Sequence, residues 1–187
     1  MKGAFMKEEL RQIISADMKR YYDKVPFLKP IQVRYLIVYR KASFYKKKSI
    51  RGIYYRMRLH MLSEKSGIQL PTKSQIGKGL FIGHFGTIIV NPDAVIGNNV
   101  NIAPGVIIGK ANRGDKKGVP QIGNDVWIGA NAVIVGQVVI GDDVLIAPNA
   151  YVNMDVPPHS IVLGNPAVIH SRENATEGYI NRRITVS

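Results

Sequence analysis

The sequence contains no cysteine, which excludes disulfide bonds, thiol nucleophiles and zinc sites built on thiolates. It also lacks a long apolar run: the longest candidate, IQVRYLIVY, contains Arg34, and none reaches the about 18 residues of a membrane span. The first residues, MKGAFMKEELR, lack the apolar core of a secretory signal. We therefore expect a cytoplasmic protein, and the residue pattern predicts no metal site.

Acidic residues are scarce in the first third of the chain. Residues 1–65 contain 17 Lys and Arg against 5 Asp and Glu, whereas residues 66–187 contain 9 against 8. The net charge of +13 is therefore concentrated at the N-terminal end. Seven of the nine tyrosines lie among these cations, in residues 21–55. The chain divides into a basic N-terminal region, residues 1–65, and a nearly neutral remainder.

The basic region has the periodicity of α-helices. Apolar residues at three- and four-residue spacing form one face of the segment KEELRQIISADMKRYY: Leu10, Ile13, Ile14 and Met18. Pro26 and Pro30 interrupt the pattern, and a second helical stretch follows over roughly residues 31–64. We expect an N-terminal α-helical region.

From residue 76 an aliphatic residue recurs every six positions, apart from two breaks. The twelve members are Ile76, Ile82, Val90, Ile96, Ile102, Ile108, Ile122, Ile128, Ile134, Ile140, Ile146 and Val152. Period six fits neither a helix nor a flat strand, but it fits a coil of short strands joined by tight turns. Stacked coils bury a column of Ile and Val that no isolated coil could bury. We predict four to five coils over residues 76–157, with Asn, Asp and Gly at corners that need positive φ. A β-sandwich would require this spacing to be a coincidence.

The six-residue rhythm is broken twice. Between Ile82 and Val90 the spacing is eight, and the extra residues fall in GHFGTI, beside His84. Between Ile108 and Ile122 it is fourteen, and the polar segment between them is predicted to leave the column as a loop. Departures from a solenoid repeat gather on its functional face. We expect the two breaks to face one another across a neighbouring subunit.

The tandem [LIV]-G-x-x-x-x hexads, the His84 segment, the loop and the closing VPPHSIVLGNPA resemble the hexapeptide-repeat acyltransferases. The resemblance covers about residues 66–170 and leaves residues 171–187 as a C-terminal tail. It is strongest with the serine acetyltransferase branch and with related capsular polysaccharide O-acetyltransferases. It implies a mainly β fold, a left-handed parallel β-helix. It also implies a homotrimer with acetyl-CoA, the cosubstrate, in the groove between adjacent helices.

The resemblance assigns the catalytic role to His84. Acetyl transfer to an alcohol needs a base that takes the hydroxyl proton while the oxygen attacks the thioester. Neutral imidazole suits this work at physiological pH. Gly83 and Gly86 leave the backbone on either side of His84 accessible. The alternative is a buried structural histidine. His60, His159 and His170 are given no chemical role.

The resemblance also implies positions along acetyl-CoA, namely Ala111 in the loop, Gly129 and Ala130 in IGANAV, and Pro148 in IAPNA. Each of these small residues is equally consistent with an ordinary tight corner. Asn91 is a candidate substrate contact, although a turn residue is the preferred interpretation.

Four positions depart from the serine-specific enzymes. The acids that precede and orient the base are replaced by Gly83 and Gln69, and the loop Arg-His pair is replaced by Gly118 and Val119. Loss of a charged contact typically costs about 2 kcal/mol or more. The sequence therefore favours a sugar or glycan hydroxyl as acceptor. The alternatives are serine O-acetylation, a non-catalytic trimeric scaffold, and N-acetylation of an amino sugar.

The basic region has three interpretations. It is a helical cap with solvated charges, a peripheral contact with an anionic membrane, or an RNA-binding surface. Each Lys or Arg near an anionic membrane gains about 1 kcal/mol, and tyrosine favours the interface. An acceptor carried on a lipid would suit the membrane contact, at the inner face of the membrane. Nucleic-acid binding is disfavoured because no RNP, KH or zinc signature is present.

Overall fold

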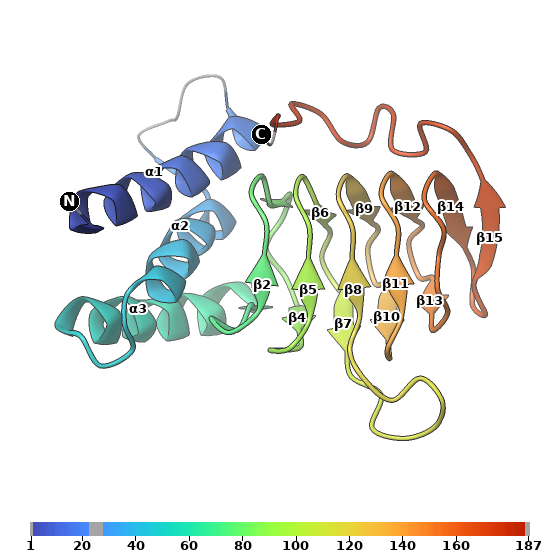
Figure 1. Ribbon diagram of the computed structural model, residues 1–187, viewed down its shortest axis with the longest axis horizontal. Helices are drawn as coiled ribbons and strands as arrows, with labels where there is room; N and C mark the ends of the chain where they lie inside the picture. Colours follow the sequence, from blue (N-terminus) through green and yellow to red (C-terminus); the bar gives the residue numbers. More distant parts are fainter. Residues whose placement is uncertain (1, 23–27, 186–187) are drawn as a thin grey trace.

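The computed structural model describes residues 2–22 and 28–185, which form three N-terminal helices followed by a parallel β-helix (Figure 1). The helices are α1 (Lys2–Tyr21), α2 (Ile31–Phe44) and α3 (Ile50–Ser66). They lie side by side at the N-terminal end of the β-helix, with α2 between α1 and α3. No helix within the described ranges combines the length and the hydrophobicity needed to cross a bilayer.

The prediction of one helical stretch over roughly residues 31–64 was wrong, because the chain reverses between α2 and α3. Ser49 caps the new helix: its side chain accepts a hydrogen bond from the Gly52 backbone N–H at 3.1 Å. Gly67 ends α3 with a left-handed φ of 76°. Pro30 directly precedes α2 as expected, whereas Pro26 lies outside the described residues.

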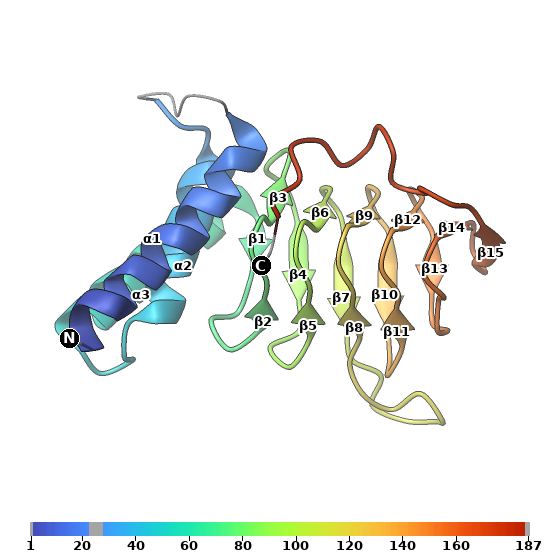
Figure 2. The same ribbon diagram turned by 45° about the horizontal axis from the view of Figure 1, so that its top comes forward.

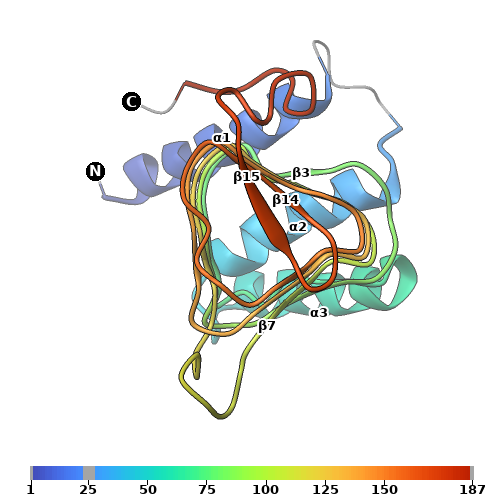
Figure 3. The same ribbon diagram turned by 90° about the vertical axis from the view of Figure 1, so that its right-hand side faces the viewer.

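Short strands form three sheets, one on each face of a triangular prism (Figure 3). Sheet 1 contains β1 (Ile68–Gln69), β4 (Ile88–Val90), β7 (Ile107–Gly109), β10 (Val133–Val135) and β13 (Tyr151–Val152). Sheet 2 contains β2 (Gln75–Ile76), β5 (Val95–Ile96), β8 (Gln121–Ile122) and β11 (Val139–Ile140). Sheet 3 contains β3 (Phe81–Ile82), β6 (Asn101–Ile102), β9 (Val126–Ile128), β12 (Val144–Ile146), β14 (Ser160–Leu163) and β15 (Val168–Ser171).

The chain visits sheets 1, 2 and 3 in turn, so that each strand pairs in parallel with the strand one coil away. The exception is β15, which pairs antiparallel with β14. Seen from the C-terminal end, successive coils run clockwise toward the viewer, which makes the helix left-handed (Figure 3). The fold prediction is confirmed. We name the three edges by the sheets that they join: edge 1-2, edge 2-3 and edge 3-1.

All twelve residues of the six-residue repeat are buried. In sheet 2, for example, Ile76, Ile96, Ile122 and Ile140 pair in register from coil to coil. Fully burying one such side chain stabilises the fold by about 1.5–3 kcal/mol. A second buried set, two positions earlier in most repeats, was missed by the period-six analysis: Leu80, Ile88, Ala94, Val100, Val106, Val126, Ala132, Val138, Val144 and Ala150.

A buried ion pair fastens the helices to the first coil. The Arg40 Nε on α2 donates to the Asp17 Oδ2 on α1 at 2.7 Å, and both side chains are almost fully buried. Arg40 also donates to the Ile76 carbonyl at 2.7 Å. Asp17 accepts from the Leu80 backbone N–H at 3.0 Å. Two helices and one coil of the β-helix therefore share one network.

Asp17→Ala should strongly destabilise the protein, because it leaves the Arg40 charge buried without its counter-ion. We expect a loss of about 3–5 kcal/mol in the free energy of unfolding, measured by urea denaturation. The control is Glu8→Ala, which removes an exposed ion pair with Arg11 on the same helix. The control should change the stability by about 0.5 kcal/mol or less. Equal effects of the two substitutions would contradict this role.

The C-terminal tail runs back along edge 2-3 from the last coil to α1 (Figures 1 and 2). Corner residues with positive φ hold it. The Asn99 Oδ1 accepts from the Ile184 backbone N–H at 3.0 Å, and Asp125 pairs with Arg183 at 3.4 Å. The Arg20 Nε on α1 then donates to the carbonyl of Asn181 in the tail at 3.0 Å. Positive φ at these corners was predicted, but their contacts with the tail were not.

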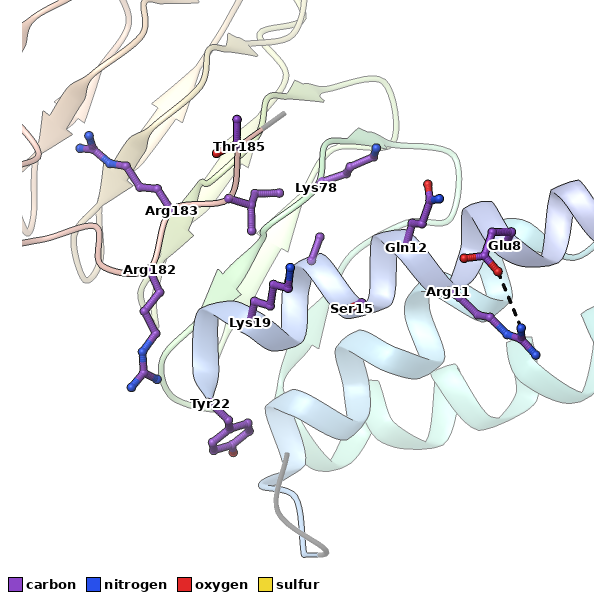
Figure 4. A pocket seen from close by; sticks show the side chains of 12 residues that line it. Glu8, Arg11, Gln12, Ser15, Lys19, Tyr22, Lys78, Arg182, Arg183 and Thr185 are labelled. Atoms are coloured by element: carbon purple, nitrogen blue, oxygen red, sulfur yellow. Dashed lines mark ion pairs between the residues drawn. The ribbon is translucent and has the colours of Figure 1, made fainter. Parts of the chain in front are cut away.

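An open groove of about 890 Å³ remains between α1 and the tail (Figure 4). Its lining includes the cations Lys19 and Lys78. Arg183, also in the lining, donates to the Thr176 Oγ1 at 2.6 Å and so stays fixed to the tail.

Asp143 is the strongest anchor of the tail. It accepts hydrogen bonds from the backbone N–H groups of Ala175 and Thr176, both at 3.0 Å, and lies 2.9 Å from the His159 Nδ1. Burial alone would raise the pKa of Asp143, but the Thr176 hydroxyl, His159 and the two amides lower it overall. The hydrogen bond with Asp143 raises the pKa of His159.

The anchor should be strongest between about pH 4 and pH 6.5. A lowered carboxyl pKa gives stability that is present above its unfolded value and lost as the pH falls. A raised imidazole pKa gives stability that is present below its unfolded value and lost as the pH rises. Hydrogen-exchange protection factors of the Ala175 and Thr176 amides should therefore peak in this window, and Asp143→Ala should abolish the peak. Asp115→Ala, in the projecting loop, is the control. Protection without pH dependence would contradict the assignment.

Candidate active site

His84 is exposed at edge 3-1, in the turn between β3 and β4. The two extra residues widen this turn beyond those of the other coils, which is visible as the green coil extending outward in Figure 3. Gly86 adopts a φ of 142°, and a Cβ there would lie 3.1 Å from the Pro104 Cβ of the next coil. The Gly86 backbone N–H donates to the Ser66 carbonyl at the end of α3, at 2.8 Å. The break in the repeat is thus a fixed, outward turn.

Two side chains from the helices hold the backbone just before His84. The Tyr21 hydroxyl on α1 accepts from the Ile82 N–H at 2.7 Å and donates to the Ile82 carbonyl at 3.0 Å. The Gln32 Nε2 on α2 donates to the Gly83 carbonyl at 3.0 Å. Burial raises the pKa of Tyr21, so its hydroxyl stays protonated and able to donate. Neither contact was predicted from the sequence, because each helix residue lies more than 50 positions from its partner.

Three predicted cofactor positions share edge 3-1 with His84. Gly129 and Ala130 follow β9, two coils from His84, and Pro148 follows β12, one coil further. With coils about 4.8 Å apart, this row begins roughly 10 Å from the His84 coil along the axis. Only glycine fits at position 129, since a Cβ there would lie 2.5 Å from the Pro148 nitrogen. The edge is therefore a continuous strip of small residues that ends at His84.

Ala111 and Asn91 lie on edge 1-2, across the width of sheet 1 from His84. Ala111 begins the projecting loop visible below the β-helix in Figure 1. The Asn91 Oδ1 accepts from the Asp93 backbone N–H at 3.0 Å, which is the geometry of a turn residue. Asp93 itself bonds to Lys73. Within a single subunit, Ala111 and Asn91 therefore do not lie near His84.

The positions that depart from the serine-specific pattern are neutral here. Gln69 points outward from sheet 1 and is exposed. Gly118 pairs antiparallel with Ala111 at the base of the loop and has a φ of 148°. A Cβ at Gly118 would lie 2.7 Å from the Gln137 Cβ, so this loop base cannot carry an arginine without shifting. Among the residues that the structure describes, no cluster of His, Asp and Glu could hold a metal ion.

The comparisons with known proteins agree with this geometry. The family of bacterial transferase hexapeptide repeats (six repeats) matches residues 120–153. Serine acetyltransferase 2 of Arabidopsis thaliana is 37% identical over 106 residues, which are 57% of this chain and 33% of that protein. The soybean serine acetyltransferase apoenzyme is 30% identical with a TM-score of 0.74, over 90% of this chain and 72% of that one.

The serine acetyltransferase of Brucella abortus strain S19, solved in complex with coenzyme A, is 25% identical with a TM-score of 0.75. That match covers 91% of this chain and 72% of the Brucella chain. The chain spans between 30% and 60% of the length of the curated relatives that it matches. It belongs to the hexapeptide-repeat acyltransferase family.

Gln32→Met should loosen the His84 turn without unfolding the protein. It removes the hydrogen bond to Gly83, and it also removes the Gln32 Oε1, a buried acceptor without a hydrogen-bond partner in the described structure. Loss of one such bond costs about 1 kcal/mol, so exchange of the Gly86 amide hydrogen should quicken roughly fivefold to tenfold. Gln75→Met, at an exposed position of β2, should leave this exchange unchanged. If the Gly86 amide hydrogen exchanges at the same rate in Gln32→Met as in the parent protein, Gln32 does not hold the His84 turn.

Proposed function

We propose that this chain is an acetyl-CoA-dependent O-acetyltransferase with His84 as its general base. The observation that carries the proposal is the strip along edge 3-1. There, an exposed histidine on a braced turn stands at the end of a row of small residues: Gly129, Ala130 and Pro148. A long, flexible cosubstrate arm can lie on such a row and present its thioester to the imidazole. The coenzyme A complex of the Brucella relative supports the cosubstrate.

The chemistry needs no covalent enzyme intermediate. The acceptor hydroxyl oxygen attacks the thioester carbonyl carbon while the His84 imidazole takes the hydroxyl proton. The carbon–sulfur bond then breaks, and the imidazolium returns the proton to the thiolate that leaves. Because the chain has no cysteine, a thiol acyl-enzyme is not available. A positioned base of this kind contributes roughly 10² to 10⁴ in rate.

A second copy of the chain would complete the site. The outer face of sheet 1 carries an in-register apolar ladder of Ile89, Ile107, Val133 and Tyr151. Such a ladder suits burial against another subunit. In a homotrimer packed through sheet 1, the edge 1-2 of one subunit would meet the edge 3-1 of its neighbour. Ala111 and the projecting loop of one copy would then face His84 of another.

L-Serine is the acceptor that the comparisons support best, because the relatives reported above are serine acetyltransferases. The sugar acceptor expected from the sequence has less support from them. The loop still carries Arg113 and Lys117, both exposed. In the proposed assembly either cation can contact a substrate carboxylate in place of the missing loop pair.

A sugar hydroxyl is the second candidate, and one observation favours it. Gln69, Gly118 and Val119 are neutral where the serine-specific pattern has charged or titratable groups. A sugar has no carboxylate, so its binding would not be weakened by the absence of charged side chains at these three positions.

Thiol release from acetyl-CoA should be measured with L-serine and with a panel of sugars and nucleotide sugars. His84→Ala should lower kcat at least about 100-fold with whichever acceptor turns over. His170→Ala, at an exposed histidine of β15, is the control and should retain activity. Turnover with serine alone would identify the first acceptor, and turnover with a sugar alone would identify the second. Absence of both turnover and acetyl-CoA binding would overturn the enzymatic proposal in favour of a scaffold.

A further inference from the structure

Helix α3 carries a stripe of large apolar side chains that face solvent. Their exposed fractions are 89% for Ile50, 50% for Ile53, 50% for Tyr54, 64% for Met57 and 55% for Met61. The spacing of three, four, seven and eleven residues from Ile50 places all five within about 100° of one helical face. The opposite face, with Gly52, Leu59 and Ser66, is the buried one. A contiguous exposed apolar patch of this kind marks an interaction surface.

Cations border the stripe at its N-terminal end and along one flank. Lys46, Lys47 and Lys48 form the turn before α3, and Arg51, Arg58 and Lys65 lie along one flank of the helix. Residues 46–66 contain only one acid, Glu64, which lies 3.4 Å from the His60 Nε2. We name this surface, residues 46–51 with the exposed face of α3 to Lys65, the α3 patch.

The boundary between the apolar stripe and the cations is ordered. The Arg58 guanidinium donates to the Tyr54 hydroxyl at 3.2 Å, and its carbon lies 5.8 Å from the centre of the Tyr54 ring. Tyr54 thus presents a ring beside the apolar stripe and a hydroxyl among the cations. A tyrosine and an arginine arranged in this way suit a membrane–water interface, where one end is apolar and the other is hydrated.

We propose that the α3 patch docks on the surface of an anionic lipid bilayer, with α3 lying in the plane of the interface. An interfacial helix combines an apolar face with flanking Lys and Arg, and it need not span the membrane. α3 is an outer helix of the three-helix layer, with α2 between it and α1 (Figures 1 and 3), and the side chains of its apolar stripe are exposed.

Charge complementarity favours a bilayer over the other partners. A second copy docking through the same patch would bring two strongly cationic surfaces together, with one acid on each side to offset them. A nucleic acid would use the cations but would leave Ile50, Ile53, Met57 and Met61 exposed. An anionic bilayer uses both features, because the headgroups attract the cations and the acyl boundary accepts the apolar side chains. The proposal does not depend on the acetyltransferase activity.

Sedimentation of the whole protein with vesicles tests the proposal. We expect binding to vesicles of phosphatidylcholine mixed with phosphatidylglycerol, weaker binding as salt is added, and little binding to phosphatidylcholine alone. Lys47→Gln with Lys48→Gln should lower the partition coefficient about 25-fold, since each cation contributes roughly a factor of five. Ile53→Gln with Met57→Gln should lower it by about tenfold or more, because apolar burial is lost.

Matched controls separate the patch from the overall charge. Lys110→Gln with Lys117→Gln, in the exposed projecting loop, removes the same charge and should have little effect. Val168→Gln, at a position 55% exposed on β15, removes an exposed apolar side chain away from the patch. Circular dichroism checks that each variant is folded.

Three results would overturn the proposal. The first is equal binding to neutral and anionic vesicles, and the second is equal loss of binding in the patch and control variants. The third is lipid binding that survives Ile53→Gln with Met57→Gln while these substitutions change the mass of the lipid-free protein measured by light scattering. That outcome would assign the patch to contact between copies.

Discussion

The inward column of Ile and Val is the constraint on which the rest of the structure depends. Each coil buries aliphatic side chains only because the coil above and the coil below cover them, so the coils must stack in register. Because the coils stack in register, the residues at each edge line up from one coil to the next. Continuity of edge 3-1 aligns His84 with Gly129 and Pro148, and continuity of edge 2-3 aligns the corner residues that bind the C-terminal tail.

The helical region is part of the site and not an appendage to it. Tyr21 and Gln32 reach from α1 and α2 to the backbone beside His84, while Asp17 and Arg40 fix the same helices to the first coil. The tail completes this arrangement, since it runs the length of the β-helix and ends its path at α1. The inner side of the basic region therefore braces the histidine, and its outer side presents the α3 patch.

Much of the fold was readable from the sequence because its signals are local or periodic. The six-residue repeat predicted a stack of short strands, and the two breaks located the irregular segment at His84 and the projecting loop. The prediction of one helical stretch over residues 31–64 was wrong because the turn between α2 and α3, residues 45–49, contains neither proline nor glycine to mark it. The second buried set was missed because the analysis followed only one aliphatic position in each repeat.

The sequence by itself determined the repeat and its breaks, because both are encoded in residues that are close along the chain, and the family resemblance named His84 as the candidate base. Only the tertiary structure decided what lies around that base. It put Gly129 and Pro148 on the edge that carries His84, and Ala111 and Asn91 on another edge. It also brought Tyr21 and Gln32 to the turn. The physical reason is that three-sided coiling and helix docking bring together residues 18 or more positions apart, and no local stretch of the sequence encodes which side chains meet around the histidine.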